Sequence, residues 1–495
     1  MSNNKSIRHG VAWLFLGGTG TQILGFLFGI ILARLLAPAD FGILVTMQIF
    51  TGIVGFLAGG GMGQALVRAT EVSKADYDAV FTLQLGIGVL IYLCLFMIAP
   101  HFAEWYKTPL YADLLRVSAL TFILRPFANI PGSILHREMR FKDRSLVAFV
   151  VLLISNVSSI VMAWSGLGVW SLVIAGLISS ITNIILLSPL AKWWPGFSLD
   201  INRAKEIIRY GMMTTTGDFL VYLRTQASNF IFSRTLGPTS LGLYNKAGSL
   251  VSIPNAIVTG SVYQVLFRAI AKEQDNKDKA QYLFLKSISL VSLYTWPMFL
   301  AIAWLALPGI RFLYGEKWVD AAPAMTLLAF IGPFTMLEML AGAVLAAFNW
   351  LSKEIPIQIA ILFITVTGAL IGVPYGLLGI TMGASVGILY GAFHLSWLAL
   401  RCLSLKPSRL FMALVPAVLI SGIIAIVLGA IEYIVDLSSW GGDVRYLACM
   451  GFSGVVVYIS LFLSLPFLVL KEEKIKWRNK LINYFNAMRP SHRIR

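Results

Sequence analysis

The chain has 495 residues, of which 58% are apolar and only 13% are charged, and its mean hydropathy is +0.79. A water-soluble fold of this length cannot bury so large an apolar fraction, so the composition excludes soluble enzymes and soluble binding proteins and predicts a polytopic membrane protein. The net charge of +16 has two possible explanations. The Lys and Arg residues can bind a nucleic acid, or they can orient the chain in a membrane.

About 20 apolar residues are needed to cross the hydrocarbon core of a bilayer. On that basis the sequence predicts an all-α fold with fourteen transmembrane helices. They lie within 11–33, 42–66, 79–100, 113–135, 146–165, 169–191, 211–233, 241–265, 284–306, 322–347, 355–374, 378–400, 410–431 and 447–470. No small-residue cleavage site follows the first apolar segment, so we expect that segment to be retained as a span.

The positions of the basic residues predict the orientation. With a cytoplasmic N-terminus, 28 of the 39 Lys and Arg residues fall in cytoplasmic segments, six in external segments and five inside predicted spans. Because Lys and Arg in short loops are retained on the cytoplasmic side, we expect both chain termini to be cytoplasmic. The basic balance is then a consequence of topology, and no nucleic-acid partner is expected.

Residues 31–70 recur 200 residues later without a gap, and 11 of the 40 aligned pairs are identical, including Pro38 with Pro238 and Gly42 with Gly242. The repeat continues, because the residues of 122–127 return in shortened form at 330–334. A period of this length is too long for a solenoid and indicates two copies of one helical bundle. Such a duplication in an apolar chain is typical of two-lobed transporters.

The repeat predicts the domain organisation. We expect an N-terminal lobe at 1–191 with spans 1–6, a cytoplasmic linker at 192–209 and a C-terminal lobe at 210–402 with spans 7–12. Two accessory spans follow in 403–470, and a basic cytoplasmic tail occupies 471–495.

Ionisable side chains near the bilayer midplane are costly, so they usually face a cavity or a charged partner. Arg125, Arg224 and Glu338 lie near the centres of predicted spans, and Asp218 and Lys246 lie at intermediate depth. In one interpretation Arg125, Arg224 and Lys246 bind the phosphates of an anionic headgroup, because guanidinium groups match phosphate oxygens. In the other, Arg224 pairs with Asp218 and Arg125 pairs with Glu338. The two carboxylates are also candidates for ion coupling.

The sequence contains no credible signature of catalysis. The five His residues are scattered, no glycine-rich phosphate loop precedes a Lys and Ser/Thr pair, and Cys94, Cys402 and Cys449 have neither disulfide nor metal-ligand spacing. We therefore expect no catalytic residue, no metal site and no cofactor, and we expect the protein not to be an enzyme.

Four motifs occur in order at matching topological positions: ARLLAPADFG at 33–42, REMRF at 137–141, GVW at 168–170 and GEKW at 315–318. Together they resemble the polysaccharide or O-antigen flippases of the multidrug/oligosaccharidyl-lipid/polysaccharide exporter superfamily, and within these the colanic-acid exporter type. The motifs fall mostly at helix ends and in loops, so we interpret them as packing and turn devices rather than as substrate ligands.

The resemblance implies a flippase of the bacterial inner membrane that works by alternating access through a cationic central cavity. Its cargo would be an undecaprenyl-pyrophosphate-linked oligosaccharide, moved to the periplasmic leaflet for exopolysaccharide, capsule or O-antigen synthesis. Membrane lipids, a polysaccharide polymerase and assembly proteins would be its other partners. Two alternatives remain open at this point: a drug/cation antiporter of the same superfamily, and a membrane glycan polymerase or ligase.

Overall fold

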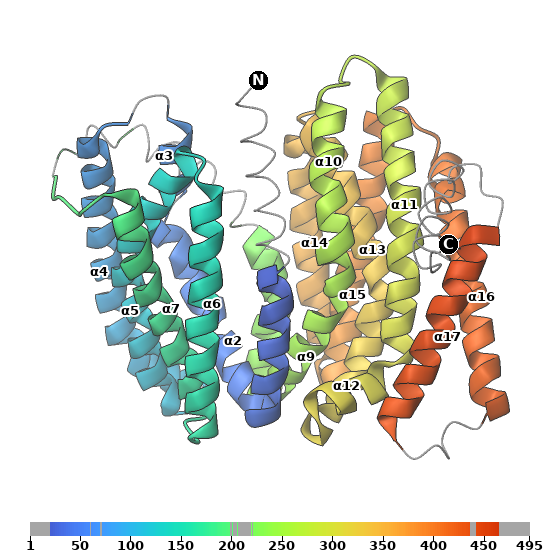
Figure 1. The fold of residues 1–495 in the computed structure, drawn as a ribbon, viewed down its shortest axis with the longest axis horizontal. Coiled ribbons are helices and arrows are strands. Elements are labelled where there is room, and N and C mark those ends of the chain that lie inside the picture. The colour runs from blue at the N-terminus through green and yellow to red at the C-terminus, as the bar shows by residue number, and fades with distance from the viewer. Residues whose placement is uncertain are drawn as a thin grey trace, which may run out of the picture. The chain divides into compact units, whose positions relative to one another are not determined.

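The computed structural model describes residues 20–59, 61–69, 72–198, 200, 205, 219, 221–435 and 442–464. Within these ranges every regular element is a helix and no strand occurs (Figure 1). The predicted all-α fold is therefore confirmed. The chain divides into two compact units, Met1–Asn245 and Lys246–Arg495.

The first unit is organised around the helix at Leu110–Arg137, labelled α5. A helix at Gly20–Leu35 is followed by α2 (Pro38–Gly59), α3 (Met62–Arg68), α4 (Lys74–Trp105), α5 (Leu110–Arg137), α6 (Phe141–Trp164) and α7 (Trp170–Ala191). A further helix covers 221–235, and α9 (Gly237–Val251) begins in this unit. Helix α5 packs against α2, α3, α4, α6 and α7, so its faces meet most of the bundle (Figure 1).

The second unit contains the remaining elements. They are a π-helical turn η1 (Asn255–Thr259), α10 (Gly260–Ala271), α11 (Lys277–Trp304), α12 (Ala306–Tyr314), η2 (Glu316–Ala321), α13 (Ala322–Ala347), α14 (Leu351–Gly372), η3 (Val373–Tyr375), α15 (Gly376–Cys402), α16 (Pro407–Val435) and α17 (Asp443–Ser464). Helix α13 packs against α10, α11 and α15, and α16 packs against α11 and α17. The two last helices, orange (α16) and red (α17) in Figure 1, are therefore attached to the bundle mainly through α11.

Length and hydropathy identify the helices that can cross a membrane. Among the described residues nine continuous segments qualify, and a tenth qualifies if α9 and the η1–α10 segment, which meet at a bend of 48°, form one span. One of the nine, Leu351–Cys402, contains both α14 and α15. The chain is thus a multi-pass membrane protein, and the predicted number of fourteen spans stays a prediction.

Local sequence signals place several helix ends and bends. Ser73 caps α4. Its hydroxyl accepts a hydrogen bond from the Asp76 amide, and the Asp76 carboxylate accepts one from the Ser73 amide. This reciprocal pair satisfies two N–H groups that have no partner within the helix. Pro126 lies inside α5 and Pro333 inside α13. An internal proline removes one helical hydrogen bond and bends the helix. The two repeat copies therefore share a proline inside corresponding helices.

The repeated Pro and Gly residues contact one another inside the first unit. A Cβ atom added to Gly42 would lie 1.7 Å from the Pro238 carbonyl oxygen, and one added to Gly242 would lie 1.9 Å from the Pro38 carbonyl oxygen. The two contacts are reciprocal, since each glycine meets the proline of the other repeat copy. Glycine is needed at both positions because only a hydrogen atom fits there.

Helix 221–235 continues this contact along α2. The Thr46 hydroxyl donates to Ser233 Oγ at 3.1 Å, and the Tyr222 hydroxyl donates to the Gln48 carbonyl at 2.8 Å. Gly52 leaves room for the Tyr222 ring, because a Cβ at this position would lie 1.9 Å from the Tyr222 hydroxyl oxygen. These contacts explain why helix 221–235 belongs to the first compact unit although it belongs to the second repeat copy.

Part of the predicted linker packs on α4. Trp193 is buried beside Phe81, with 5.5 Å between the ring centroids, and the Gly196 amide donates to Asp78 Oδ1 at 3.2 Å. Most of 199–209 and the whole of the predicted tail 471–495 lie outside the described residues.

Candidate functional site

The first unit contains an open cavity of about 1090 Å³. Its walls come from α2, α3, α5, α6, α7 and helix 221–235. Three of its lining side chains carry or can gain positive charge: Arg125, His136 and Arg144. A cavity of this size inside a membrane-spanning bundle is large enough to hold a ligand well beyond the size of an ion.

One face of α5 supplies the polar side of the cavity. Arg125, Asn129, Ser133 and His136 all line it and follow one another at intervals of four, four and three residues. Residues at these intervals lie on one helix face. From Arg125 to His136 the helix rises about 16 Å, at 1.5 Å per residue, so the polar face extends over half of the hydrocarbon thickness.

Arg125 is held at one end of this face by the backbone of α2. Its Nη1 donates to the Gly55 carbonyl oxygen at 3.1 Å, and a Cβ at Gly55 would lie 3.2 Å from the same nitrogen. Within the described part of the chain Arg125 forms no ion pair with a carboxylate. Since a guanidinium group has five N–H donors, most of them are available to a ligand.

The second repeat copy has no space for an equivalent cation. In the repeat alignment Gly332 corresponds to Arg125, and a Cβ at Gly332 would lie 2.2 Å from the ring of Phe299. Phe299 is buried, at 2% exposure, so its ring has little room to yield. The cation of the first copy and the packed aromatic ring of the second are therefore a real difference between the two copies.

The other end of the polar face carries Arg144, at the start of α6, and His136, in the last turn of α5. Arg144 is half-buried, and its guanidinium makes no hydrogen bond or ion pair with a described residue. The sequence alone assigns Arg144 to a cytoplasmic loop, because an arginine eight residues after His136 gives no sign that the α5–α6 turn brings both into one cavity.

Amide and hydroxyl groups line the cavity between the two cationic ends. Asn129 Nδ2 donates to Gln84 Oε1 at 3.2 Å, and Asn183 Nδ2 donates to the Ser179 carbonyl at 3.0 Å. Their side-chain oxygens remain as acceptors. Gly63 of α3 lies against Asn129, with a Cβ-to-Oδ1 distance of 2.9 Å for an added Cβ, so α3 adds no bulky side chain there. Groups of this kind bind hydroxyl-rich ligands.

Arg224 lies on helix 221–235, but it is not among the described residues that line the cavity; its neighbours Tyr222 and Gln226 are. Residues 222 and 226 are separated by one helical turn and share a face, whereas residue 224 lies on the opposite side. Arg224 therefore does not line this cavity. Its role in binding the headgroup stays a prediction. Asp218, its predicted partner, lies outside the described residues.

Lys246 and Glu338 belong to the second unit. The Lys246 ammonium lies over the rings of Tyr314 and Trp318, at 5.4 Å and 6.0 Å from their centroids, a cation–π arrangement. Trp318 is the last residue of the GEKW motif and is fully buried. Glu338 is buried in α13, at 9% exposure, and faces Gly391 of α15. Of the predicted site residues among the described ones, Arg125 and Arg224 thus belong to the first unit, and Lys246 and Glu338 belong to the second.

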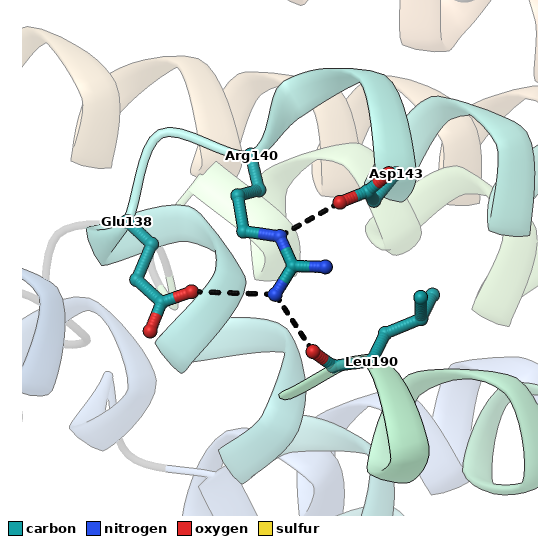
Figure 2. Close-up of polar contacts among 4 residues, drawn as sticks. All are labelled: Glu138, Arg140, Asp143 and Leu190. Carbon is teal, nitrogen blue, oxygen red and sulfur yellow. Dashed lines mark hydrogen bonds and ion pairs between the residues drawn. The ribbon is translucent and has the colours of Figure 1, made fainter. Parts of the chain in front are cut away.

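The REMRF motif forms a brace outside the cavity (Figure 2). The Arg140 guanidinium pairs with Asp143 at 2.7 Å and with Glu138 at 3.4 Å, and it donates to the Leu190 carbonyl at 2.7 Å. The hydrogen bond to Asp143 raises the pKa of Arg140 above its ordinary value. Arg137 donates to the carbonyls of Leu66 and Ala69. The motif therefore joins the α5–α6 turn to α3 and α7.

A helical chain with many spans, an internal duplication and a polar cavity inside its bundle is a membrane transporter by class. The family model described as polysaccharide biosynthesis protein matches residues 31–323. The chain therefore belongs to this family, which consists of flippases of the multidrug/oligosaccharidyl-lipid/polysaccharide exporter superfamily. The resemblance drawn from the four motifs is thereby confirmed.

Individual relatives agree with this assignment. The chain is 27% identical to the succinoglycan biosynthesis transport protein ExoT of Rhizobium meliloti over 327 residues, which cover 66% of each chain. It is 22% identical to the lipopolysaccharide biosynthesis protein WzxC of Escherichia coli over 77% of this chain and 78% of WzxC. A solved structure of the lipid II flippase MurJ in its inward closed conformation is similar in fold, with a TM-score of 0.74 at 14% identity, covering 94% of this chain and 99% of MurJ.

Proposed function

We propose that the protein moves an undecaprenyl-pyrophosphate-linked oligosaccharide from the cytoplasmic to the periplasmic leaflet of a bacterial inner membrane. Succinoglycan and lipopolysaccharide biosynthesis are the roles named for ExoT and WzxC, and a lipid-linked repeat unit is the cargo class that such roles require. Both chain termini are cytoplasmic in this proposal, as the distribution of Lys and Arg predicts. A polysaccharide polymerase and assembly proteins would act on the cargo after its release.

The observation that carries the proposal is the position of Arg125 in an apolar bundle. Its guanidinium lines the cavity and has a single hydrogen bond to protein, to Gly55, within the described residues. A pyrophosphate can accept paired hydrogen bonds from such a group. The amides and hydroxyls beside it suit a sugar, while the polyprenyl chain would stay in the bilayer. A cationic lining favours this cargo over the cations carried by a drug/cation antiporter.

In the proposed mechanism the two lobes, 1–191 and 210–402, alternate in opening the site to either side of the membrane. Moving one negative charge out of an inside-negative cell is favoured by about 2.3 kcal/mol per 100 mV, so the membrane potential can supply driving force for an uncompensated anion. Asp218 and Glu338 are the proposed residues if a proton or sodium ion is exchanged at the same time, with Arg224 and Lys246 as further proposed headgroup ligands.

The test is translocation of labelled lipid-linked oligosaccharide in membrane vesicles at matched expression. We expect Arg125→Gln to reduce the initial rate at least tenfold, because removing one charge-assisted contact costs about 1.5–3 kcal/mol, and we expect Arg125→Lys to retain part of the activity. Arg116→Gln is the matched control, since Arg116 lies on the same helix but contacts Asp113 and the Phe96 ring instead of the cavity. Wild-type transport by Arg125→Gln would remove Arg125 from the mechanism.

A further inference from the structure

The cavity has two cationic ends, and only one of them is needed for a pyrophosphate. Arg125 stands at one end, and His136 of α5 and Arg144 of α6 line the other. His136 lies about 16 Å further along α5 than Arg125, at 1.5 Å per residue. A pyrophosphate is shorter than this rise along α5. Coulomb attraction falls inversely with distance, so such a ligand would attract a charge at the far end with about a quarter of the energy of a charge at 4 Å.

We infer that the second cationic end binds an acidic group on the glycan, so that the transporter prefers oligosaccharides with a carboxylate or a similar anion a few sugars away from the pyrophosphate. This inference rests on the proposed function, because it assigns the pyrophosphate to Arg125. It names the charge of the glycan as a determinant of cargo selection.

The lining between the two ends supports a ligand that runs along α5. Gln64, Asn129, Ser133 and Asn183 lie between them and come from three helices. Neutral hydroxyl groups of intervening sugars can hydrogen-bond to these amides and hydroxyls without any charge. A diphosphate followed by a few hexoses is long enough to cover this stretch, whereas a diphosphate alone is not.

The charge at the far end is not used by the protein itself within the described residues. The Arg144 guanidinium makes no hydrogen bond and no ion pair there, in contrast to Arg140, four residues earlier, whose guanidinium contacts Glu138, Asp143 and Leu190. A half-buried guanidinium needs acceptors for its donors. Arg140 is therefore the structural cation of this turn, and Arg144 is the one directed into the cavity.

Binding of defined probes to the purified full-length protein tests the inference. The probes are farnesyl diphosphate, a farnesyl-diphosphate-linked neutral trisaccharide, the same trisaccharide with a terminal glucuronic acid, and its isomer with the glucuronic acid next to the diphosphate. Affinities are measured in phosphatidylcholine nanodiscs and repeated with phosphatidylglycerol, which separates a glycan carboxylate from a phospholipid headgroup as the occupant of the second end.

We expect the terminal-acid probe to bind about tenfold more tightly than the neutral one, which corresponds to one additional charge-assisted contact, and the isomer to bind like the neutral probe. Arg144→Gln should abolish the preference and leave the neutral probe unchanged, while Arg144→Lys should keep part of it. Arg125→Gln should weaken every probe, and Arg116→Gln should change none.

Three results would overturn the inference while leaving the proposed function intact: equal affinity for acidic and neutral probes, an Arg144→Gln variant that weakens farnesyl diphosphate as much as Arg125→Gln does, or a preference that phosphatidylglycerol abolishes. Failure of every probe to bind, or binding that is insensitive to Arg125→Gln, would instead contradict the proposed function itself.

Discussion

At Gly42 and Gly242 two helices from different repeat copies approach each other through backbone atoms. Each glycine lies against the carbonyl oxygen of the proline four residues from the other glycine, at Pro238 and Pro38. Because the neighbouring atoms belong to the backbone, they cannot move aside as the end of a flexible side chain can. A single methyl group at either position would have to separate α2 from α9.

We expect Gly42→Ala to destabilise the protein by about 1–3 kcal/mol, the usual cost of overpacking, and to lower the thermal unfolding midpoint in detergent. Gly248→Ala, in the same helix as Gly242, is the control, because no atom lies within 4 Å of an added Cβ there. Alanine is the better helix former by about 1 kcal/mol, so this control should unfold at the same or a higher temperature. Equal midpoints for the two variants would contradict the close contact.

Single residues also show how far the sequence could predict the site. The sequence indicated that Arg125 lies deep in a span, and the structure places it in the cavity. The same reasoning gave Arg224 a cavity position, whereas Tyr222 and Gln226 occupy that face. An isolated charge in an apolar helix reveals its depth along the helix but not the direction in which it points, because a uniformly apolar helix has no distinct face from which to infer it.

At the level of elements, the pattern of apolar segments predicted where helices occur, but it did not predict where a helix bends. The predicted span 241–265 is a helix that bends by 48° between Val251 and Asn255, followed by the π-helical turn η1. Pro254 lacks the N–H that a continuous helix would use. The Pro254 signal is present in the sequence, but the contacts that stabilise the bend come from another helix and are not readable from the segment itself.

The bend is held by Asn255, whose Nδ2 donates to Thr335 Oγ1 of α13 at 2.6 Å and whose Oδ1 accepts from Thr259 at 2.9 Å. We expect Asn255→Ala and Thr335→Val each to lower the unfolding midpoint, since each removes the bond between the two side chains, worth about 1 kcal/mol. Asn255→Ala also removes the bond from Thr259 and should be the less stable single variant, and the double variant should unfold near it. Ser252→Ala, which loses only a bond within its own helix, should change little. Additive shifts would show that the two side chains do not cooperate.

At the level of the whole molecule, an alternating-access cycle requires the two repeat copies to move against each other. The contact between α2 and helix 221–235 joins parts of both copies, at Thr46 with Ser233 and at Tyr222 with Gln48. If this contact belongs to one state of the cycle, a covalent bond across it will stop transport. Thr46 and Ser233 are suitable for such a bond, because their Oγ atoms are 3.1 Å apart.

We expect the variant Thr46→Cys/Ser233→Cys, in a background with Cys94, Cys402 and Cys449 replaced by Ala, to lose transport after oxidation and to regain it with a reductant. Ala303→Cys/Thr326→Cys, a pair between two helices of the second unit where the Thr326 hydroxyl approaches the Ala303 carbonyl, should form a cross-link and keep its activity. Full transport by the completely cross-linked first pair would show that α2 and helix 221–235 move together throughout the cycle.

The reciprocal contact of Gly42 with Pro238 and of Gly242 with Pro38 has the form of an isologous interface, in which the same patch of two identical chains meets itself. A single-repeat ancestor could therefore have made this contact as a homodimer before its gene was duplicated and fused. In such a homodimer one substitution would have changed both sides of the contact at once. After fusion, positions outside this contact, such as Arg125 and Gly332, can differ between the two copies.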